Sequence, residues 1–289
     1  LLMTHVISFW KASFSRSVLL SFFLLSGLLS LDAQVQLGAD IDGEAASDQS
    51  GHSVSLSDDG SRVAIGAPSN DGVGNNSGHT RIYEWDGSSW VQLGADIDGE
   101  AMVDFSGWSV SLSDDGSRVA IGARGNDDAG SAAGHARIYE WDGSSWVQLG
   151  ADIDGEAGGD NSGYSVSLSG DGSRVAIGGP RNDGNGNNAG HARIYEWDGS
   201  SWVQLGADID GEATGDESGW SVSLSDDGSR VAIGALYNDG VGSNSGHTRI
   251  YEWDGSSWVQ LGADIDGEAL GDNFGCSVSL SDDGNRVAI

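Results

Sequence analysis

The sequence is poor in cysteine, proline and basic residues. Its 289 residues include one cysteine, Cys276, two prolines, and 13 Lys plus Arg against 44 Asp plus Glu, for a formal net charge of -31. A single cysteine excludes an intrachain disulfide framework and a thiolate metal cluster. So few basic side chains argue against nucleic acid or an anionic membrane as partner, because both would repel the chain. Cationic or neutral partners are favoured.

Long apolar runs are missing except near the N-terminus. Two leucines precede Met3, which we take as the true start, and Lys11 and Arg16 come before an apolar stretch over 18–31 that leads to Ala33. This order predicts a secretory signal peptide over 1–33, with a retained membrane anchor as the alternative. The mature part, 34–289, is therefore expected to be secreted or displayed at the cell surface, with no membrane insertion.

The rest of the chain is one unit written repeatedly. The segment Gln-Leu-Gly-Ala-Asp-Ile-Asp-Gly-Glu-Ala recurs every 56 residues without insertion. A fixed period of this length indicates a repeat architecture. The last unit stops inside a recurring Arg-Val-Ala-Ile-Gly segment, so we expect a ring that is incomplete and truncated at its C-terminus. The units are 36–91, 92–147, 148–203, 204–259 and a partial 260–289.

Each unit predicts four short strands. In the first unit these cover 53–57, 62–66, 81–85 and 90–98, with the hairpin signals Asp58-Asp59-Gly60 and Asp86-Gly87 between them. We expect Val91, Leu93, Ala95 and Ile97 on one side of the fourth strand. No segment has the helical period. The pattern predicts an all-β chain, a β-propeller of four-stranded antiparallel blades. A linear β-solenoid is the alternative, although its coils are usually shorter and its strands parallel.

The residues of the unit resemble a known family. The segment 50–68, Ser-Gly-His-Ser-Val-Ser-Leu-Ser-Asp-Asp-Gly-Ser-Arg-Val-Ala-Ile-Gly-Ala-Pro, resembles the FG-GAP repeat of integrin α-subunit propellers and of many exported proteins. Phe-Gly stands at Phe274-Gly275, and Gly-Ala-Pro at 66–68. The resemblance covers every unit from about Gln36. It implies a propeller, commonly of seven blades, and extracellular display.

The same resemblance raises the question of calcium. Many FG-GAP blades hold Ca²⁺ in an Asp-x-Asp/Asn-x-Asp-Gly-x-x-Asp hairpin between the first two strands. Here the pattern falls on Ser55, Ser57, Asp59, Gly60 and Val63, so one carboxylate and the glycine remain. That is too few ligands for firm calcium binding. We expect a plain hairpin, no metal site and no cofactor, with weak calcium binding as the alternative.

Other acidic segments allow two interpretations each. The Asp40-Ile-Asp42-Gly-Glu44 motif is expected to be a solvated edge rather than a cation site, and five near-identical copies are a poor way to build one active site. The loop 70–72, Asn-Asp-Gly, is expected to form a turn, although it could hold calcium together with Asp48. No catalytic motif is present, so we expect no enzyme activity.

Histidine and tryptophan recur once or twice in each unit. One histidine precedes the third strand, which does not line a propeller's channel, so a hydrogen-bonded structural role is favoured over a zinc site. The histidines are His79, His135, His191 and His247. Trp85 and Trp90 flank a hairpin, and packing between blades is favoured over a carbohydrate-stacking platform.

The units differ from one another mainly in two loops. In a propeller, the connection into the first strand and the connection from the second to the third strand share one face, the variable loop face. Exposed aromatic and arginine side chains dominate binding energies, so this face is the candidate ligand site. Neutral drift in tolerant loops is the alternative. The predicted contacts are Trp108, Tyr164, Trp220, Arg124, Arg181 and Tyr237.

The sequence thus predicts a non-catalytic binding or adhesion module for an extracellular protein or glycan ligand. Two alternatives stay open. One is an accessory propeller of a larger extracellular enzyme, and the other is an acidic matrix protein that binds calcium weakly. We also expect an open arc of blades, prone to aggregation, in which a strand at 35–41 could serve the last blade.

Overall fold

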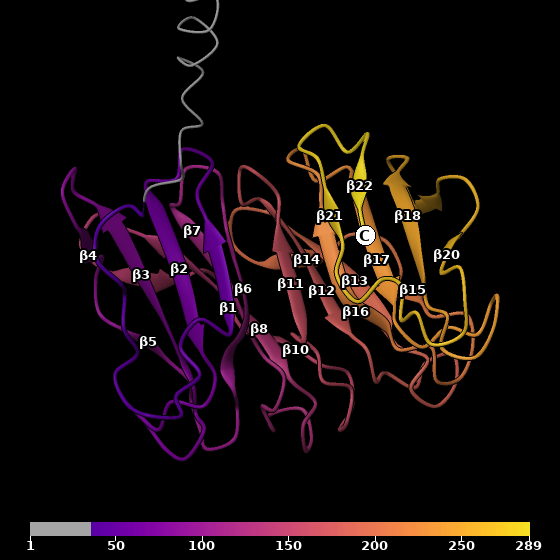
Figure 1. The fold of residues 1–289 in the computed structure, drawn as a ribbon, viewed down its shortest axis with the longest axis horizontal. Helices are drawn as coiled ribbons and strands as arrows, with labels where there is room; N and C mark the ends of the chain where they lie inside the picture. The colour runs from indigo at the N-terminus through magenta and orange to yellow at the C-terminus, as the bar shows by residue number, and fades with distance from the viewer. Residues whose placement is uncertain (1–35) are drawn as a thin grey trace, which may run out of the picture. The chain divides into compact units, whose positions relative to one another are not determined.

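A computed structural model of the chain describes residues 36–289, so the predicted signal peptide lies outside the described residues. Residues 40–289 form one compact unit. Within 36–289 every regular element is a β-strand, which confirms the all-β prediction (Figure 1). No helix of the described part is long and apolar enough to cross a membrane.

Four antiparallel sheets follow one another along the chain, and each is one propeller blade. Blade 1 contains β1 (Ser53–Leu56), β2 (Arg62–Ala67), β3 (His79–Trp85), β4 (Trp90–Gln92) and β5 (Ile97–Asp98). Blade 2 contains β6 (Ser106–Leu112), β7 (Arg118–Ala123), β8 (His135–Trp141), β9 (Trp146–Gln148) and β10 (Ile153–Asp154). The strand order within each blade is sequential, as short hairpin connections require.

The later blades repeat this pattern. Blade 3 contains β11 (Ser165–Leu168), β12 (Arg174–Gly179), β13 (His191–Trp197), β14 (Trp202–Gln204) and β15 (Ile209–Asp210). Blade 4 contains β16 (Ser218–Leu224), β17 (Arg230–Ala235), β18 (His247–Trp253), β19 (Trp258–Gln260) and β20 (Ile265–Asp266). A two-stranded sheet, β21 (Ser279–Leu280) and β22 (Val287–Ala288), follows blade 4.

The fourth strand departs from the prediction. It is interrupted into β4 and β5, which both pair with β3 but at opposite ends of it. Between them Gly94 has a φ of 83°, and a side chain there would come within 2.8 Å of the indole ring of Trp141 from the next blade. Val91 is 49% exposed while Ile97 is 6% exposed, so the expected one-sided alternation is wrong. Likewise, no strand is present over 36–41.

Consecutive blades share a hydrophobic core. The first core joins Ala64 and Ile82 of blade 1 to Val110, Ile121 and Tyr139 of blade 2, and equivalent cores join blades 2 and 3 and blades 3 and 4. Trp146 packs against the first core, and its indole N–H donates to the carbonyl of Leu93 at 2.8 Å. Trp202 and Trp258 pack against the next two cores in the same way, so the predicted packing between blades is confirmed for these three repeats, whereas Trp85 and Trp90 of blade 1 contact each other at 5.5 Å between ring centroids.

The first strands of consecutive blades lie side by side. The hydroxyl of Ser55 accepts a hydrogen bond from the amide of Leu112 at 2.9 Å, and the same bond recurs between each later pair of blades. At the hairpin end, backbone amide-to-carbonyl bonds of 2.8–3.0 Å link one residue of each unit to the next. These residues are Asp58, Asp114, Gly170, Asp226 and Asp282. The hairpins therefore converge at one end of the first strands.

Candidate ligand-binding site

The opposite end of the first strands begins with a repeated tight turn. In blade 2 the amide of Trp108 donates to the carbonyl of Phe105 at 3.1 Å, and Phe105 and Gly107 have φ values of 56° and 81°. Gly107 is required, because a side chain there would meet the carbonyl oxygen of His79 and the Cα of Gly66 in blade 1. The glycine thus lets two blades approach closely and fixes the position of the residue after it.

The residues after these glycines form a continuous row of rings. Ring centroids are 4.3 Å apart for His52 and Trp108, 5.6 Å for Trp108 and Tyr164, and 4.6 Å for Tyr164 and Trp220. Tyr237, from the loop after β17, extends the row at 5.9 Å from Trp220. These separations lie in the range of favourable aromatic pairs. We call these five residues the aromatic row.

Arg124 closes over one part of the aromatic row. Its guanidinium carbon lies 3.7 Å from the ring centroid of Trp108 and 5.0 Å from that of Phe105. Burial, followed by the nearby charge of Arg181, lowers the pKa of Arg124. Its Nε atom is buried without a hydrogen-bond partner among the described residues. The stacking on Trp108 and Phe105 therefore holds this guanidinium in place.

The row is only partly shielded from water. Trp108, Tyr164 and Trp220 are half-buried, and Arg181 is exposed beside them. Burial raises the pKa of Tyr164 to about 12, so its phenol stays protonated and can donate a hydrogen bond at neutral pH. Burial also raises the pKa of Glu217, against the opposing charge of Arg181. The face therefore combines apolar rings with a few polar groups, as ligand sites do.

The structure brings five of the six predicted contact residues together. Trp108, Tyr164, Trp220, Tyr237 and Arg124 touch one another in sequence along the row. Arg181 is close enough to influence the charges of its neighbours but makes no ring contact in the described part. Two residues were missed, Phe105 and His52. Both lie in the same variable segments, and the 56-residue offset between His52 and Trp108 was the signal that could have found the second.

The clefts of the described surface lie elsewhere. Two clefts of about 220 Å³ repeat between consecutive blades, one lined by Asp96, Ile97, Tyr139 and Trp146. They do not include any member of the aromatic row.

The hairpin between the first two strands is closed by its own side chains and backbone. The Oδ1 atom of Asp59 accepts hydrogen bonds from the Ser57 hydroxyl at 2.9 Å and from the Ser61 amide at 2.8 Å. The only carboxylate on the family's calcium pattern is therefore used to close the turn, and the serine hydroxyl is turned toward it. The interpretation as a plain hairpin agrees with this geometry.

The loop after β2 is a turn held by its own side chains. The Asn70 Oδ1 atom accepts from the Gly72 amide at 2.8 Å, and the Asn70 side-chain amide donates to Asp48 at 3.0 Å. Asp48 also accepts from the amide of Ala45 at 3.0 Å. Asn70 and Asp48 do converge, which the sequence left open, but they bond to each other.

The repeated histidines correct an expectation. Their side chains are almost completely buried, and both ring nitrogens of His135, His191 and His247 lack a hydrogen-bond partner among the described residues. The expected hydrogen-bonded role is therefore wrong for His135 and His247, whereas the long contact of His191 with Asp208 lowers the pKa of that carboxyl. Instead, each Nδ1 faces two carboxylates at 3.7–4.0 Å. The sequence could not show this convergence, because the acids come from separate segments.

Comparison with known sequences identifies the repeat. The sequence profile described as the FG-GAP repeat matches residues 208–251, which contain β15, β16, β17 and most of β18. Residues 208–251 form an FG-GAP repeat. The two halves of the FG-GAP motif meet between blades here, because Gly234 at the end of the second strand packs on Gly275 at the start of the next unit. No curated protein matches the chain.

Solved structures with a similar fold have very different sequences. One is a Bacteroides uniformis protein assigned as a 6-phosphogluconolactonase, with a TM-score of 0.52 and 13% identity over 82% of this chain and 63% of that one. Another is the Pseudomonas aeruginosa periplasmic gluconolactonase PpgL, with a TM-score of 0.52 and 16% identity over 76% of this chain and 58% of that one. The chain thus spans less than two thirds of either protein. The likeness supports the propeller fold of this chain.

Proposed function

We propose that this FG-GAP chain is a secreted or surface-displayed, non-catalytic module that binds an extracellular protein or glycan through the aromatic row. The observation that carries the proposal is the unbroken contact from His52 to Tyr237, with Arg124 stacked on Trp108. Tryptophan, tyrosine and arginine are the residues that contribute most to binding energy at protein interfaces. Aromatic faces also stack on sugar rings.

The distribution of differences among the units supports this choice of face. The hairpin ends read almost identically in every unit, whereas the residues of the aromatic row differ from unit to unit. Identical rings are not needed to close the turn, since the amide-to-carbonyl bond of that turn recurs with His52, Trp108, Tyr164, Trp220 and Cys276 alike. The ring chemistry at these positions is therefore free to serve a ligand.

The charges of the chain and of the aromatic row limit the kinds of ligand that can bind. The formal net charge of -31 repels polyanions, while Arg124 and Arg181 place positive charge locally at the row. A neutral glycan, or a protein surface with few acidic groups at its centre, fits both facts. An extracellular location is supported by the predicted signal peptide and by the FG-GAP repeat, which is typical of extracellular proteins.

The test is a binding screen with a matched pair of variants. The labelled recombinant chain is applied to an array of neutral glycans and to an array of extracellular protein domains. For any bound spot, the double variant Trp108→Ala/Trp220→Ala is expected to bind roughly 10- to 100-fold more weakly, as loss of central aromatic anchors does. The control is Val147→Ala/Val203→Ala, which truncates two side chains that are each 49% exposed on β9 and β14.

Two outcomes would contradict the proposal. Binding that survives the tryptophan variant but falls in the valine control would move the site to the outer strands. Hydrolysis of gluconolactone by the chain, at a rate that depends on an intact fold, would contradict a non-catalytic role. Circular dichroism and the melting temperature of each variant establish that the fold is intact.

A further inference from the structure

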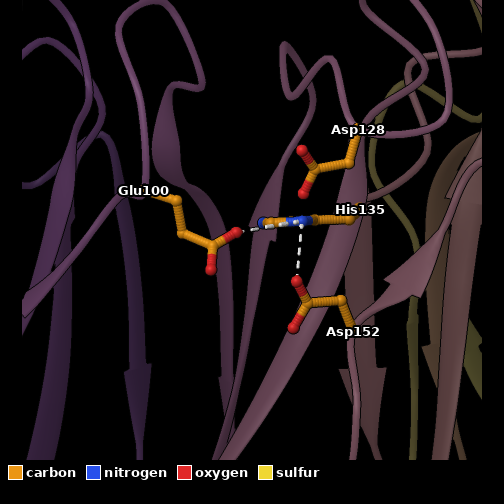
Figure 2. Close-up of side chains that lie close together, drawn as sticks. All are labelled: Glu100, Asp128, His135 and Asp152. Atoms are coloured by element: carbon orange, nitrogen blue, oxygen red, sulfur yellow. Dashed lines mark ion pairs between the residues drawn. The ribbon is translucent and has the colours of Figure 1, made fainter.

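Blade 2 carries a cluster of three carboxylates around a buried histidine. Glu100 comes from the connection between β5 and β6, Asp128 from the loop between β7 and β8, His135 from the start of β8, and Asp152 from the residue before β10. One oxygen or nitrogen of each lies within 4.8 Å of those of the others. In Figure 2 the imidazole ring is seen edge-on, with Asp128 and Asp152 on opposite sides of it and Glu100 beside it. We call these four residues the blade 2 cluster.

The histidine is the unexplained member of this cluster. Its side chain is fully buried, and both ring nitrogens lack a hydrogen-bond partner among the described residues. Nδ1 lies 3.7 Å from Asp152 Oδ2 and 3.9 Å from Glu100 Oε2, which is too far for hydrogen bonds. Leaving a buried polar atom unpaired costs free energy. A ligand between these atoms would remove that cost.

The separations fit a shared metal ion. Bonds of about 2.0–2.2 Å from one tetrahedral ion place neighbouring ligand atoms roughly 3.4 Å apart. The distances of 3.7 and 3.9 Å from His135 Nδ1 to Asp152 and Glu100 are slightly longer, and all four ligand atoms lie within 4.8 Å of one another, so a small inward movement of the side chains would complete the site. An imidazole nitrogen among carboxylate oxygens suits Zn²⁺ and similar first-row ions, whereas Ca²⁺ takes oxygen ligands. The three carboxylates and the guanidinium group of Arg137 together carry a formal charge of about -2, which a divalent cation would neutralise.

Two carboxylates of the cluster each have one oxygen next to a neighbouring side chain and the other oxygen facing His135. Asp152 Oδ1 accepts from the side-chain amide of Gln148 at 2.5 Å, which leaves Oδ2 facing His135. Glu100 Oε1 lies 3.5 Å from Arg137 Nη1, which leaves Oε2 facing His135. Partners of this kind orient metal ligands.

The other blades contain the same cluster with one ligand fewer. Their triads are Glu44, His79 and Asp96, then Glu156, His191 and Asp208, and finally Glu212, His247 and Asp264. Where blade 2 has Asp128, the equivalent positions are Gly72, Gly184 and Gly240. Residues 36–289 therefore contain one four-ligand cluster and three natural three-ligand counterparts.

We propose that Glu100, Asp128, His135 and Asp152 form a binding site for a divalent transition-metal cation of the zinc class, and that Asp128 makes it the tightest such site among the described blades. This site lies apart from the aromatic row and is independent of the ligand proposed for it.

The experiment compares the chain with two variants that its own repeats suggest. The recombinant chain is freed of metal with a chelator and titrated with Zn²⁺ by calorimetry, and with Co²⁺ by visible absorption. Wild type is expected to show one tight site per chain. Asp128→Gly reproduces the sequence of the other blades and should weaken that site at least about tenfold.

Gly184→Asp tests the same idea as a gain. It should create a second tight site in blade 3. Asp128 shows that this loop position accepts an aspartate, and the backbone amide of Asp128 donates a hydrogen bond to Asn126 Oδ1 at 2.9 Å. The backbone amide of Gly184 makes the equivalent hydrogen bond to Asn182 Oδ1 at 2.8 Å. The control is Asp226→Asn, which removes a carboxylate at the hairpin end and should leave Zn²⁺ affinity unchanged.

Three results would overturn the proposal. The first is Zn²⁺ binding that is equally weak in wild type and in Asp128→Gly. The second is displacement of Zn²⁺ by an equal concentration of Ca²⁺, which would mean that histidine is not a ligand. The third is a tight site that His135→Gln leaves intact in a variant whose melting temperature is unchanged.

Discussion

The guanidinium group of Arg124 stacks on the indole of Trp108, with its carbon 3.7 Å from the ring centroid. Both residues belong to blade 2, but they lie on different sides of the hairpin, after β7 and within β6. The contact joins the two variable loops of one unit into a single surface. It also covers part of the indole, which otherwise would face water.

This contact should be measurable without any ligand. In a double-mutant cycle on Arg124→Ala and Trp108→Ala, we expect a coupling free energy of about 1 kcal/mol, in the range of partly desolvated cation–π pairs. Urea denaturation followed by circular dichroism gives the four free energies of unfolding. Arg124→Lys keeps the charge and should retain only part of the coupling, since a lysine lacks the planar stacking surface. Additive single effects would contradict the interaction.

Glycines of consecutive blades approach one another closely, so one added methyl group there should lower the free energy of unfolding strongly. A side chain at Gly122 would overlap the carbonyl oxygen of Gly163 in blade 3 and the hydroxyl of Ser109. Gly122→Ala should therefore lower the free energy of unfolding by about 3 kcal/mol, at the upper end of overpacking costs. Gly158→Ala is the comparison, because its nearest neighbour is the carbonyl oxygen of Ser131 at 3.2 Å in an exposed loop, so a small movement of the loop can admit the methyl group and the loss should be smaller than for Gly122→Ala.

The arginine at the start of each second strand ties two blades together. Arg118 donates to Glu140 Oε1 through Nε at 3.0 Å and Nη2 at 2.9 Å, and to the carbonyl of Gly172 in blade 3 at 3.1 Å. Arg118→Lys cannot reproduce this fork and should cost about 1–2 kcal/mol of unfolding free energy. Arg286→Lys is the matched control, since Arg286 has no such glutamate among the described residues. Equal losses in the two variants would refute the argument.

The converging hairpin ends predict a pH dependence. Burial, then the charges of Asp58 and Asp282, raises the pKa of Asp114, and burial, then Asp114 and Asp282, raises the pKa of Asp226. Acids with a raised pKa hold their protons more tightly in the folded state. Their protonation therefore stabilises the fold below the unfolded-state pKa near 3.8, and this contribution is lost as pH rises through the folded-state pKa.

Asp226→Asn should consequently raise the melting temperature at pH 7, by an amount that corresponds to less than about 1 kcal/mol and shrinks in 0.5 M salt. The gain should vanish below about pH 4. Gly170→Asp, which restores the acid of the other units, should act in the opposite direction, because the Asp114 carboxylate already occupies the space beside Gly170. Asp254→Asn serves as the control. Hydrogen bonds from Ser257 and Ser256 lower the pKa of Asp254, so its loss should destabilise the fold at neutral pH.

Much of the fold could be predicted, because the strand and turn signals of each unit lie within its own sequence. The strands expected at 62–66 and 81–85 are present within two residues of those limits, and the alternation of loops between two faces follows from an antiparallel order. The fourth strand was mispredicted at Gly94. Its backbone turns there to admit Trp141, which lies 47 residues later in the sequence, and no local pattern contains that information.

The candidate ligand site was predicted by comparing units, and the metal-ligand cluster was not. Four members of the aromatic row, His52, Trp108, Tyr164 and Trp220, lie at one repeated position, so a constant offset of 56 residues is enough to align them. The blade 2 cluster draws on Glu100, Asp128, His135 and Asp152 from four separate segments. An acid in this acidic chain is not distinctive until a buried imidazole is placed beside it.

The sequence by itself determined the repeat, the all-β blades and the face on which the units differ, because hydrophobic alternation and turn residues act over a few neighbouring positions. Only the tertiary structure decided which side chains meet. Contact between Arg124 and Trp108, overlap of Gly122 with Gly163, and the carboxylates around His135 all depend on how blades pack. Packing is set by the fit of whole surfaces, which no single segment encodes.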